Sequence, residues 1–278
     1  MKISLLTDAP RHNLALMKIS AWHKLNGDEV MLNMPIFSSD MRYASLLFDK
    51  NKKHFIADVY GGPAFEYSIL PGEFENAKPD YSLFDLDYSV GYTFRPCFNT
   101  CSFCKVPKMN HPSITHNSIW DFHDSKLKKI CLLNNNTFQD PKWKETFEEI
   151  WDADLTVIDE NGYDVRLLDD EKANALKKTK FQGSIHFAFD RIQDEALVLS
   201  GLEVLKRHKI KARFYVLVGY NSNIDQDIYR CQKLIEHGFD PYIMPYIRNK
   251  STKRFKRFID SFMWRKYKTI KEAWQNYY

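Results

Sequence analysis

Short apolar segments alternate with amphipathic helical segments through most of the chain after residue 88. The pattern predicts strands at 88–94, 129–133, 155–158 continued by 163–167, 184–189, 211–218 and 241–245. It predicts helices at 118–125, 141–152, 169–179, 193–208 and 224–237. Six such units imply a parallel sheet, built as an open doubly wound sheet or as a barrel, with functional groups at the carboxyl ends of the strands.

The first eighty residues predict a small α/β unit of their own. Strands are expected at 2–6, 29–33 and 54–59, and a helix at 14–25 begins after Asn13, a suitable N-cap. The segment at 70–80 contains prolines and a glycine, which suit a linker. We therefore expect a domain boundary near residue 80.

Composition indicates a folded intracellular protein. The chain has 278 residues, of which 44% are hydrophobic and 15% aromatic, enough to bury a substantial core. The first residues are too polar for a secretory segment, and no later stretch approaches a membrane span, so a cytoplasmic location without membrane contact is expected. Five cysteines, three of them crowded together, do not suit a disulfide framework.

The crowded cysteines are Cys97, Cys101 and Cys104, directly after the strand predicted at 88–94. Thiolates on one loop can converge on a soft metal centre, and they select zinc, copper(I) or iron–sulfur clusters. Three ligands leave one coordination position open, which implies chemistry rather than a purely structural site. The alternative is a closed zinc site, completed by His111 or His116.

The spacing Cys97-x-x-x-Cys101-x-x-Cys104, with Phe103 before the last cysteine, resembles the signature of the radical S-adenosylmethionine (SAM) superfamily. The resemblance covers residues 81–248 and implies a partial (β/α)6 TIM-like barrel. The segments 13–23, 162–168 and 185–191 look like an uncharacterised group of small bacterial and phage radical SAM proteins. In that group the resemblance extends over nearly the whole chain, with residues 1–80 as a short, reduced Rossmann-like unit that resembles a cobalamin-binding domain.

The resemblance implies a [4Fe–4S] cluster held by the three cysteines, with SAM on the fourth iron. One electron, from a donor of the flavodoxin or ferredoxin type, would cleave SAM to a 5′-deoxyadenosyl radical that abstracts hydrogen from a substrate. Such a protein is oxygen-sensitive. No general acid or base stands out in the sequence, so catalytic residues stay unknown.

The resemblance also implies SAM contacts. Phe103 would lie near the adenine, and Asn134, Asn135 and Asn136 replace the Gly-Gly-Glu that usually binds the SAM amino group. Side chains at later strand ends would supply contacts to the ribose hydroxyls and the carboxylate: Asn161, Asp164, Arg166 and Asp190. Arg166 suits a carboxylate because its planar fork binds two oxygens. Each of these residues could equally be a polar cap at a strand end.

Cobalamin is not expected. Only three strands are predicted before residue 80, too few for a doubly wound sheet that shelters a corrin. His12 lies in the loop after the first strand and could in principle coordinate cobalt, but a lone loop histidine more often serves as a hydrogen-bond partner.

The carboxyl-terminal segment is basic, although the whole chain carries a formal charge of only +4. Ten Lys or Arg residues between Arg248 and Lys271 face a single acid, Asp260. Apolar residues at helical spacing predict that 249–278 forms a basic amphipathic helix or tail docked on the body: Phe255, Phe258, Ile259 and Phe262. Nucleic-acid contact through the exposed charges is an additional expectation.

Two functions from different classes follow. The first is a radical SAM enzyme acting on a nucleic-acid base or nucleotide, although a peptide or small metabolite fits nearly as well. The second is a zinc-stabilised nucleic-acid-binding module without catalysis. Tyr242, Met244 and Tyr246 alternate along the last strand, so one set points into the barrel or packs in the core.

Overall fold

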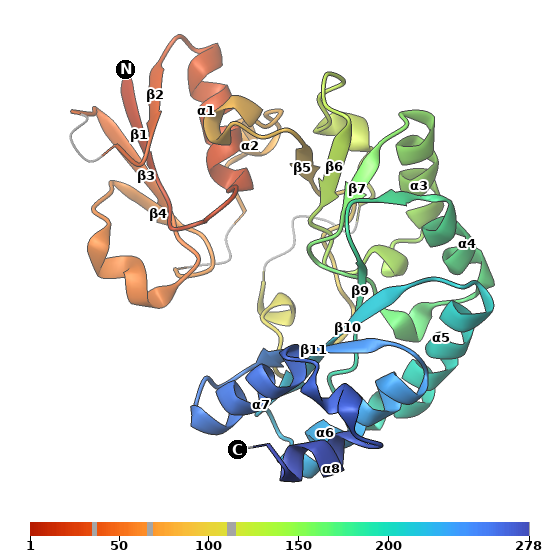
Figure 1. Cartoon of the computed structure of the whole chain (residues 1–278). Helices are drawn as coiled ribbons and strands as arrows, with labels where there is room; N and C mark the ends of the chain where they lie inside the picture. The colour runs from red at the N-terminus through yellow and green to blue at the C-terminus, as the bar shows by residue number, and fades with distance from the viewer. Residues whose placement is uncertain (35–37, 66–68, 110–114, 278) are drawn as a thin grey trace. The chain divides into compact units, whose positions relative to one another are not determined.

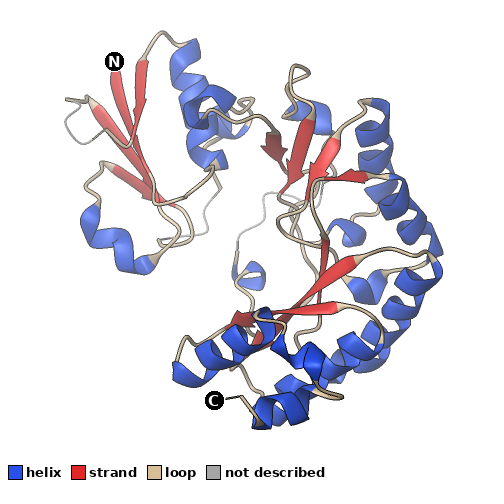
Figure 2. Cartoon of the chain, viewed as in Figure 1, coloured by secondary structure: helices blue, strands red, loops and turns tan. Residues whose placement is uncertain are grey.

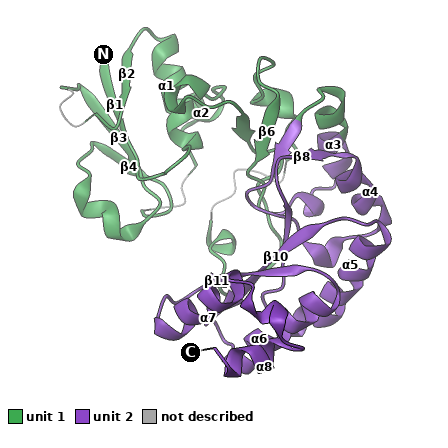
Figure 3. Ribbon diagram, in the orientation of Figure 1, with its two compact units in different colours: residues 1–135, 148–155 green, residues 136–147, 156–278 purple. Residues whose placement is uncertain are grey.

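The computed structural model describes residues 1–34, 38–65, 69–109 and 115–277. It divides into two compact units, shown in Figure 3: Met1–Asn135 with Glu148–Leu155, and Asn136–Phe147 with Thr156–Tyr278. The domain boundary expected near residue 80 falls inside the first unit and stays a prediction. Both units combine helices with parallel strands, so the mixed α/β class is confirmed. None of the helices in the described ranges is both long and apolar enough to cross a membrane.

The first unit begins with a four-stranded parallel sheet (Figure 1). Its strands are β1 (Lys2–Leu6), β2 (Glu29–Leu32), β3 (Met41–Ser45) and β4 (Val59–Gly61), in the order β2-β1-β3-β4. Helix α1 (Leu14–Leu25) and the short α2 (Gly72–Glu75) join this sheet in one core, in which Ile3 and Leu5 cluster with Leu16 and Phe74. The side chain of Asn13 caps α1 by accepting from Leu16 N at 3.2 Å, as the sequence predicts.

The strand predicted at 54–59 is wrong. A 3-10 turn at Asp49–His54 precedes it, β4 begins only at Val59, and the sequence pattern misses β3 at Met41–Ser45. The reason is burial: Ile56, which makes the segment look like a strand, is 76% exposed, whereas Ala44 of β3 is buried. The amino-terminal sheet therefore has four strands rather than three.

The same unit contains the parallel pair β5 (Ser89–Gly91) and β6 (Lys129–Leu132). The strand predicted at 88–94 is shorter than expected, and the helix predicted at 118–125 is wrong, because only a 3-10 turn forms at Ile119–Asp121. Tyr81 Oη donates to the carbonyl of Phe122 at 2.6 Å, which occupies an acceptor that a longer helix would use. The ring of Phe122 lies against Gly91, where a Cβ would approach it to 2.4 Å.

The second unit is built on parallel strands flanked by helices (Figure 2). Its strands are β7 (Thr156–Ile158), β8 (Lys180–Phe181), β9 (Ile185–Ala188), β10 (Ala212–Val218) and β11 (Asp240–Pro245). Strands β7 and β8 pair in parallel, and β11-β10-β9 form a three-stranded parallel sheet. The helices are α3 (Trp143–Asp152), whose residues divide between the two units, α4 (Asp170–Lys178), α5 (Glu195–Arg207) and α6 (Ile224–Glu236).

The predicted strand at 163–167 is wrong, because a 3-10 turn forms at Val165–Leu167. The carboxylate of Asp164 accepts from Arg166 N at 3.2 Å and starts this turn. Gly201 of α5 approaches so closely that a Cβ there would meet the carbonyl oxygen of Val165 at 2.3 Å. Because α5 packs this closely against Val165, the segment forms a tight turn instead of the predicted strand.

The chain ends in α7 (Lys250–Asp260) and α8 (Ile270–Gln275). Phe255, Phe258 and Ile259 are buried, so the predicted docking of a basic amphipathic helix is confirmed for α7. Phe262 lies just beyond the helix with a left-handed φ of 54° and is only partly buried.

Candidate functional site

The three clustered cysteines lie on the loop that follows β5. Cys97, Cys101 and Cys104 are not in disulfides, and each keeps part of its side chain exposed. Cys104 N donates to Cys101 O at 3.0 Å, and Val106 N lies 3.4 Å from Cys104 Sγ as a donor. In the described ranges, no three His, Cys, Asp or Glu side chains surround a single ion position.

The donor set of this loop fits an iron–sulfur cluster. The thiols are soft ligands, and in a cubane each thiolate binds a different iron, so the sulfurs need not converge on one point. An N–H aimed at the sulfur of Cys104 is the kind of contact that stabilises a cluster-bound thiolate. Of the two histidines proposed for a zinc site, His111 lies outside the described residues.

The base of the cysteine loop is held by asparagines after β6. Asn134 is 2% exposed, and its Oδ1 accepts from Thr93 N at 2.9 Å and from Phe94 N at 3.1 Å. Its Nδ2 donates to Thr93 Oγ1 at 2.8 Å, and Asn135 Nδ2 donates to the carbonyl of Arg95. Two of the three asparagines predicted to contact SAM therefore anchor the backbone that leads to the cysteines.

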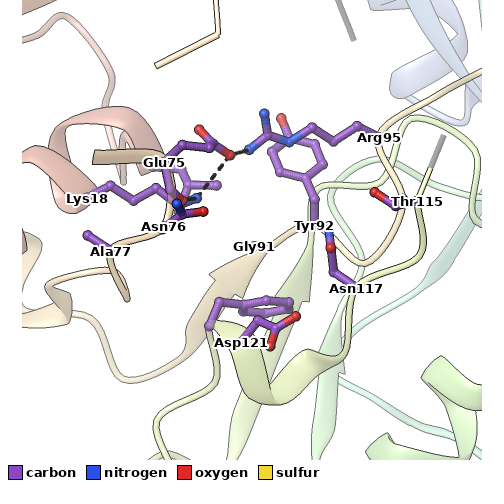
Figure 4. Close-up of a pocket in the computed structure, with 12 residues that line it drawn as sticks. Lys18, Glu75, Asn76, Ala77, Gly91, Tyr92, Arg95, Thr115, Asn117 and Asp121 are labelled. Atoms are coloured by element: carbon purple, nitrogen blue, oxygen red, sulfur yellow. Dashed lines mark hydrogen bonds and ion pairs between the residues drawn. The ribbon is translucent and has the colours of Figure 1, made fainter. Parts of the chain in front are cut away.

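A cavity of about 430 Å³ adjoins this loop base (Figure 4). Its lining includes Tyr92 and Arg95, before the cysteines, and Asn117, after them. On the other side Glu75 forms ion pairs with Arg95 and with Lys18, whose Nζ lies 3.2 Å from Oε1. Burial is the main cause that lowers the pKa of Lys18. Sequence reasoning missed this cavity because Lys18 is one position of a predicted helix and Glu75 lies in the segment predicted as a linker, with no local signal that the two meet.

In the second unit, the predicted SAM residues after β7 form a charged network. Arg166 binds Asp164 with two parallel contacts, Nε–Oδ1 and Nη2–Oδ2, both 2.8 Å, and its Nη1 lies 3.2 Å from Asp194 Oδ2. Asn136 Nδ2 donates to Asp164 Oδ2 at 3.1 Å. The structure thus brings Asn136, Asp164 and Arg166 together, while Asn161 is exposed on the loop nearby.

Asp190 lies at the end of β9, next to a buried arginine that the sequence did not reveal. Leu217 N donates to Asp190 Oδ1 at 3.0 Å, and burial raises the pKa of Asp190 to about 6. Arg230 of α6 is 1% exposed and donates to the carbonyls of Phe189, Asp190 and Leu217 at 2.7, 2.6 and 2.7 Å. Arg230 also forms an ion pair with Asp227 at 2.6 Å. In the sequence these two residues are only an oppositely charged pair at i,i+3 on a predicted helix.

One face of the sheet formed by β9, β10 and β11 also brings together a histidine and two tyrosines. His186 Nδ1 lies 3.3 Å from Asp159 Oδ2, and the His186 ring stacks on Tyr215 at 5.0 Å with an interplanar angle of 9°. Tyr242 of β11 meets Tyr215 edge-on at 5.8 Å. Met244, two residues along β11, is 44% exposed, so this face is not closed core. Asp159 accepts hydrogen bonds from Gly162 N at 2.8 Å and from His186 N at 2.7 Å, whereas His186 Nδ1 has no hydrogen-bond partner among the described residues.

Comparison with known proteins gave a likeness among solved structures. No family model matches the chain, and no curated protein matches it. Among solved structures it is similar to the radical S-adenosylmethionine methyltransferase TsrM from Kitasatospora setae, solved with cobalamin and a [4Fe–4S] cluster bound. The TM-score is 0.66 at 11% sequence identity, over 88% of this chain and 74% of that one. The chain therefore shares the α/β fold of a radical SAM methyltransferase.

Proposed function

We propose that this protein is a radical SAM enzyme that holds a [4Fe–4S] cluster through Cys97, Cys101 and Cys104. One observation carries the proposal: three partly exposed cysteines outside any disulfide lie on a single loop at the carboxyl end of β5, in a chain with the fold of a radical SAM methyltransferase. Active sites of parallel α/β folds gather at that end of the strands. The finer assignment to a small bacterial and phage group, and the partial six-unit barrel, stay part of the proposal.

When bound, the cluster supplies the electron that splits SAM into methionine and a 5′-deoxyadenosyl radical. The chain's own residues position the cofactors. Asn134 and Asn135 fix the backbone before the cysteines, and Phe103 is proposed to pack on the adenine. A one-electron donor of the flavodoxin or ferredoxin type is the expected partner.

Recognition of the SAM carboxylate falls to Arg166 in this proposal. Asp164 and Asp194 already neutralise Arg166, so an incoming carboxylate has to compete with them for its donors. Asp190, with a pKa of about 6, can donate or accept a hydrogen bond near neutral pH and suits a ribose hydroxyl. Asn136 would act through Asp164, which it orients.

Cobalamin binding stays open to experiment. The expectation that it is absent rests on three predicted strands before residue 80, whereas the sheet has four. His12, the residue considered for cobalt, lies with Nδ1 at 2.8 Å from Tyr88 Oη, as expected for a hydrogen-bonded loop histidine. We keep cobalamin outside the proposal and include it in the test.

The test is anaerobic reconstitution of the full chain with iron and sulfide. We expect about four irons per chain, a brown protein, and 5′-deoxyadenosine when SAM and a reductant are added. A colourless protein that holds zinc and releases no 5′-deoxyadenosine would support the zinc-stabilised binding module instead. Retention of hydroxocobalamin after desalting, read from its visible spectrum, would add cobalamin to the cofactors.

A further inference from the structure

We infer that the carboxyl-terminal part of the second unit binds single-stranded nucleic acid, with the phosphates on a basic stripe of α7 and the bases on the rings of Tyr220 and Tyr246. The basic stripe consists of Lys250, Lys253 and Arg257. Binding does not depend on the cluster chemistry proposed above, so the two proposals can fail separately.

The basic stripe is a line of cations without compensating acids. Its members are spaced three and four residues apart, so they share one side of the helix, and all three are exposed. Within the described ranges none of them forms an ion pair with a carboxylate, whereas the neighbouring Lys256 pairs with Asp260 at 2.8 Å. If these cations served only solubility, acids four residues away on the same side would stabilise the helix through ion pairs. The basic stripe has no such acids.

The stripe is held in a fixed orientation. Asn249 and Thr252 form a reciprocal capping box at the start of α7, with hydrogen bonds of 2.9 and 3.2 Å. Phe255, Phe258 and Ile259 bury the opposite side of the helix. Rigid cations lose less conformational freedom when they bind phosphates than cations on a flexible tail would.

An exposed tyrosine ring lies directly before this helix. Tyr246, just beyond β11, is 49% exposed, and its ring meets that of Tyr220 at 4.7 Å with an interplanar angle of 66°. Ile247, the next residue, is 56% exposed. The protein therefore leaves the Tyr246 ring and the Ile247 side chain in solvent, four and three residues before the stripe begins, with the partly buried ring of Tyr220 against that of Tyr246.

The combination of rings and cations selects the ligand. Unpaired bases stack on aromatic side chains while basic residues follow the backbone, and this pairing of features is typical of single-strand binding. A duplex hides the faces of its bases, so it can use only the cations. An acidic peptide likewise would use the cations and gain little from the rings.

The test uses the reconstituted full chain and a fluorescently labelled oligo(dT) or oligo(U) of about 20 nucleotides, longer than the ~4–16 nucleotides that such sites cover. We expect binding by fluorescence anisotropy that weakens steeply with salt. The same measurement with a blunt duplex and with poly-glutamate as competitor separates base stacking from simple charge. We expect the single strand to bind at least about tenfold more tightly than the duplex.

Two variants and two controls locate the surface. Lys250→Glu with Lys253→Glu should weaken single-strand binding and flatten the salt dependence by about 0.7 in log–log slope for each phosphate that is no longer neutralised. The matched control is Lys177→Glu with Lys178→Glu on α4, which changes the charge equally at a remote exposed site and should bind as the parent does. Tyr246→Leu should lower single-strand affinity about tenfold and leave duplex affinity unchanged, while Tyr246→Phe keeps the ring and the affinity.

Any one of four outcomes would overturn the inference. Equal weakening by the α7 and α4 pairs would mean that only net charge matters. Equal affinity for duplex and single strand, or an unchanged single-strand affinity in Tyr246→Leu, would remove the stacking role. Displacement of the oligonucleotide by poly-glutamate at equal charge concentration would assign the surface to acidic peptides.

Discussion

Each unit contains loops at strand ends that a buried side chain holds in place, and the two side chains differ in charge: a neutral amide in the first unit and a guanidinium in the second. In the first unit the neutral amide of Asn134 binds backbone N–H groups before the cysteines. In the second unit the charged fork of Arg230 binds two carbonyls just after β9 and one near the end of β10, and it is neutralised by Asp227. A neutral anchor adds no charge beside the three cysteines, whereas a buried cation secures its loops strongly but makes them depend on its counterion. We expect the first anchor to govern the proposed metal centre and the second to govern stability.

The largest effect tests whether the thiols on the amide-anchored loop hold the cluster. Cys101→Ala should reduce the iron content of the reconstituted protein to a small fraction and abolish 5′-deoxyadenosine formation, because two thiolates hold a cubane poorly. Iron analysis and chromatography of the reaction mixture check this result.

The chain supplies its own matched controls for that experiment. Cys131 on β6 and Cys231 on α6 are both fully buried, and burial strongly raises the pKa of the Cys231 thiol. Cys131→Ala and Cys231→Ala should keep their iron, since neither thiol lies on the cysteine loop. A Cys101→Ala protein with full iron content and activity would refute the proposed function.

The second effect measures the charged anchor. Arg230→Met should lower the free energy of unfolding by about 3–5 kcal/mol, because Asp227 would stay buried without its counterion. Urea titration at constant pH gives this value. Arg207→Met is the control: its pair with Asp170 is exposed, 57% and 63% for the two side chains, and its loss should cost less than about 1 kcal/mol. If both variants lost the same free energy of unfolding, the buried guanidinium of Arg230 would contribute no more to stability than the exposed one of Arg207.

A third experiment sharpens the comparison at the neutral anchor. Asn134→Ala should lower the free energy of unfolding by about 1–3 kcal/mol, since Thr93 N and Phe94 N lose a buried acceptor. Asn134→Asp restores the acceptor but places a negative charge near the cysteine loop, so it should be more stable than Asn134→Ala while its cluster becomes harder to reduce. Urea titration and a spectroscopic redox titration separate these two effects. A cluster in Asn134→Asp that reduces as easily as the parent's would show that anchor charge is irrelevant.

The sequence predicts a feature well when the residues that determine it are close together along the chain. The cap at Asn13 and the strands β1, β6, β10 and β11 follow from periodicity within a few residues, and the sequence predicts these strands to within one residue at each end. For Asn134 the sequence predicts a cofactor contact instead, because its distance from Thr93 along the chain hides the hydrogen bonds between them.

Sequence patterns fail where distant residues decide the outcome. The strand predicted at 163–167 is a turn because α5 packs closely against Val165, and the helix predicted at 118–125 is cut short beside Tyr81 and Gly91. Arg230 looks like a surface cation, since nothing in its neighbourhood along the chain shows that three carbonyls converge on it. Tertiary packing overrides local propensity in each case.

The smallest effect concerns Asp190, which shares the charged anchor's surroundings. Its pKa of about 6 in the folded protein exceeds the roughly 3.9 of an unfolded aspartate. Between these values the folded state keeps a proton that the unfolded state has lost, so stability falls as the pH rises from about 4 to about 6 and stays lower above that.

Asp190→Asn keeps the acceptor for Leu217 N but cannot ionise. Its advantage over the parent should therefore be absent below about pH 4 and reach about 1–2 kcal/mol above pH 6, in view of the partial exposure of the side chain. Urea titrations at several pH values between about 3.5 and 7.5 give both curves, and parallel curves would show that Arg230 and Leu217 hold the carboxylate ionised throughout.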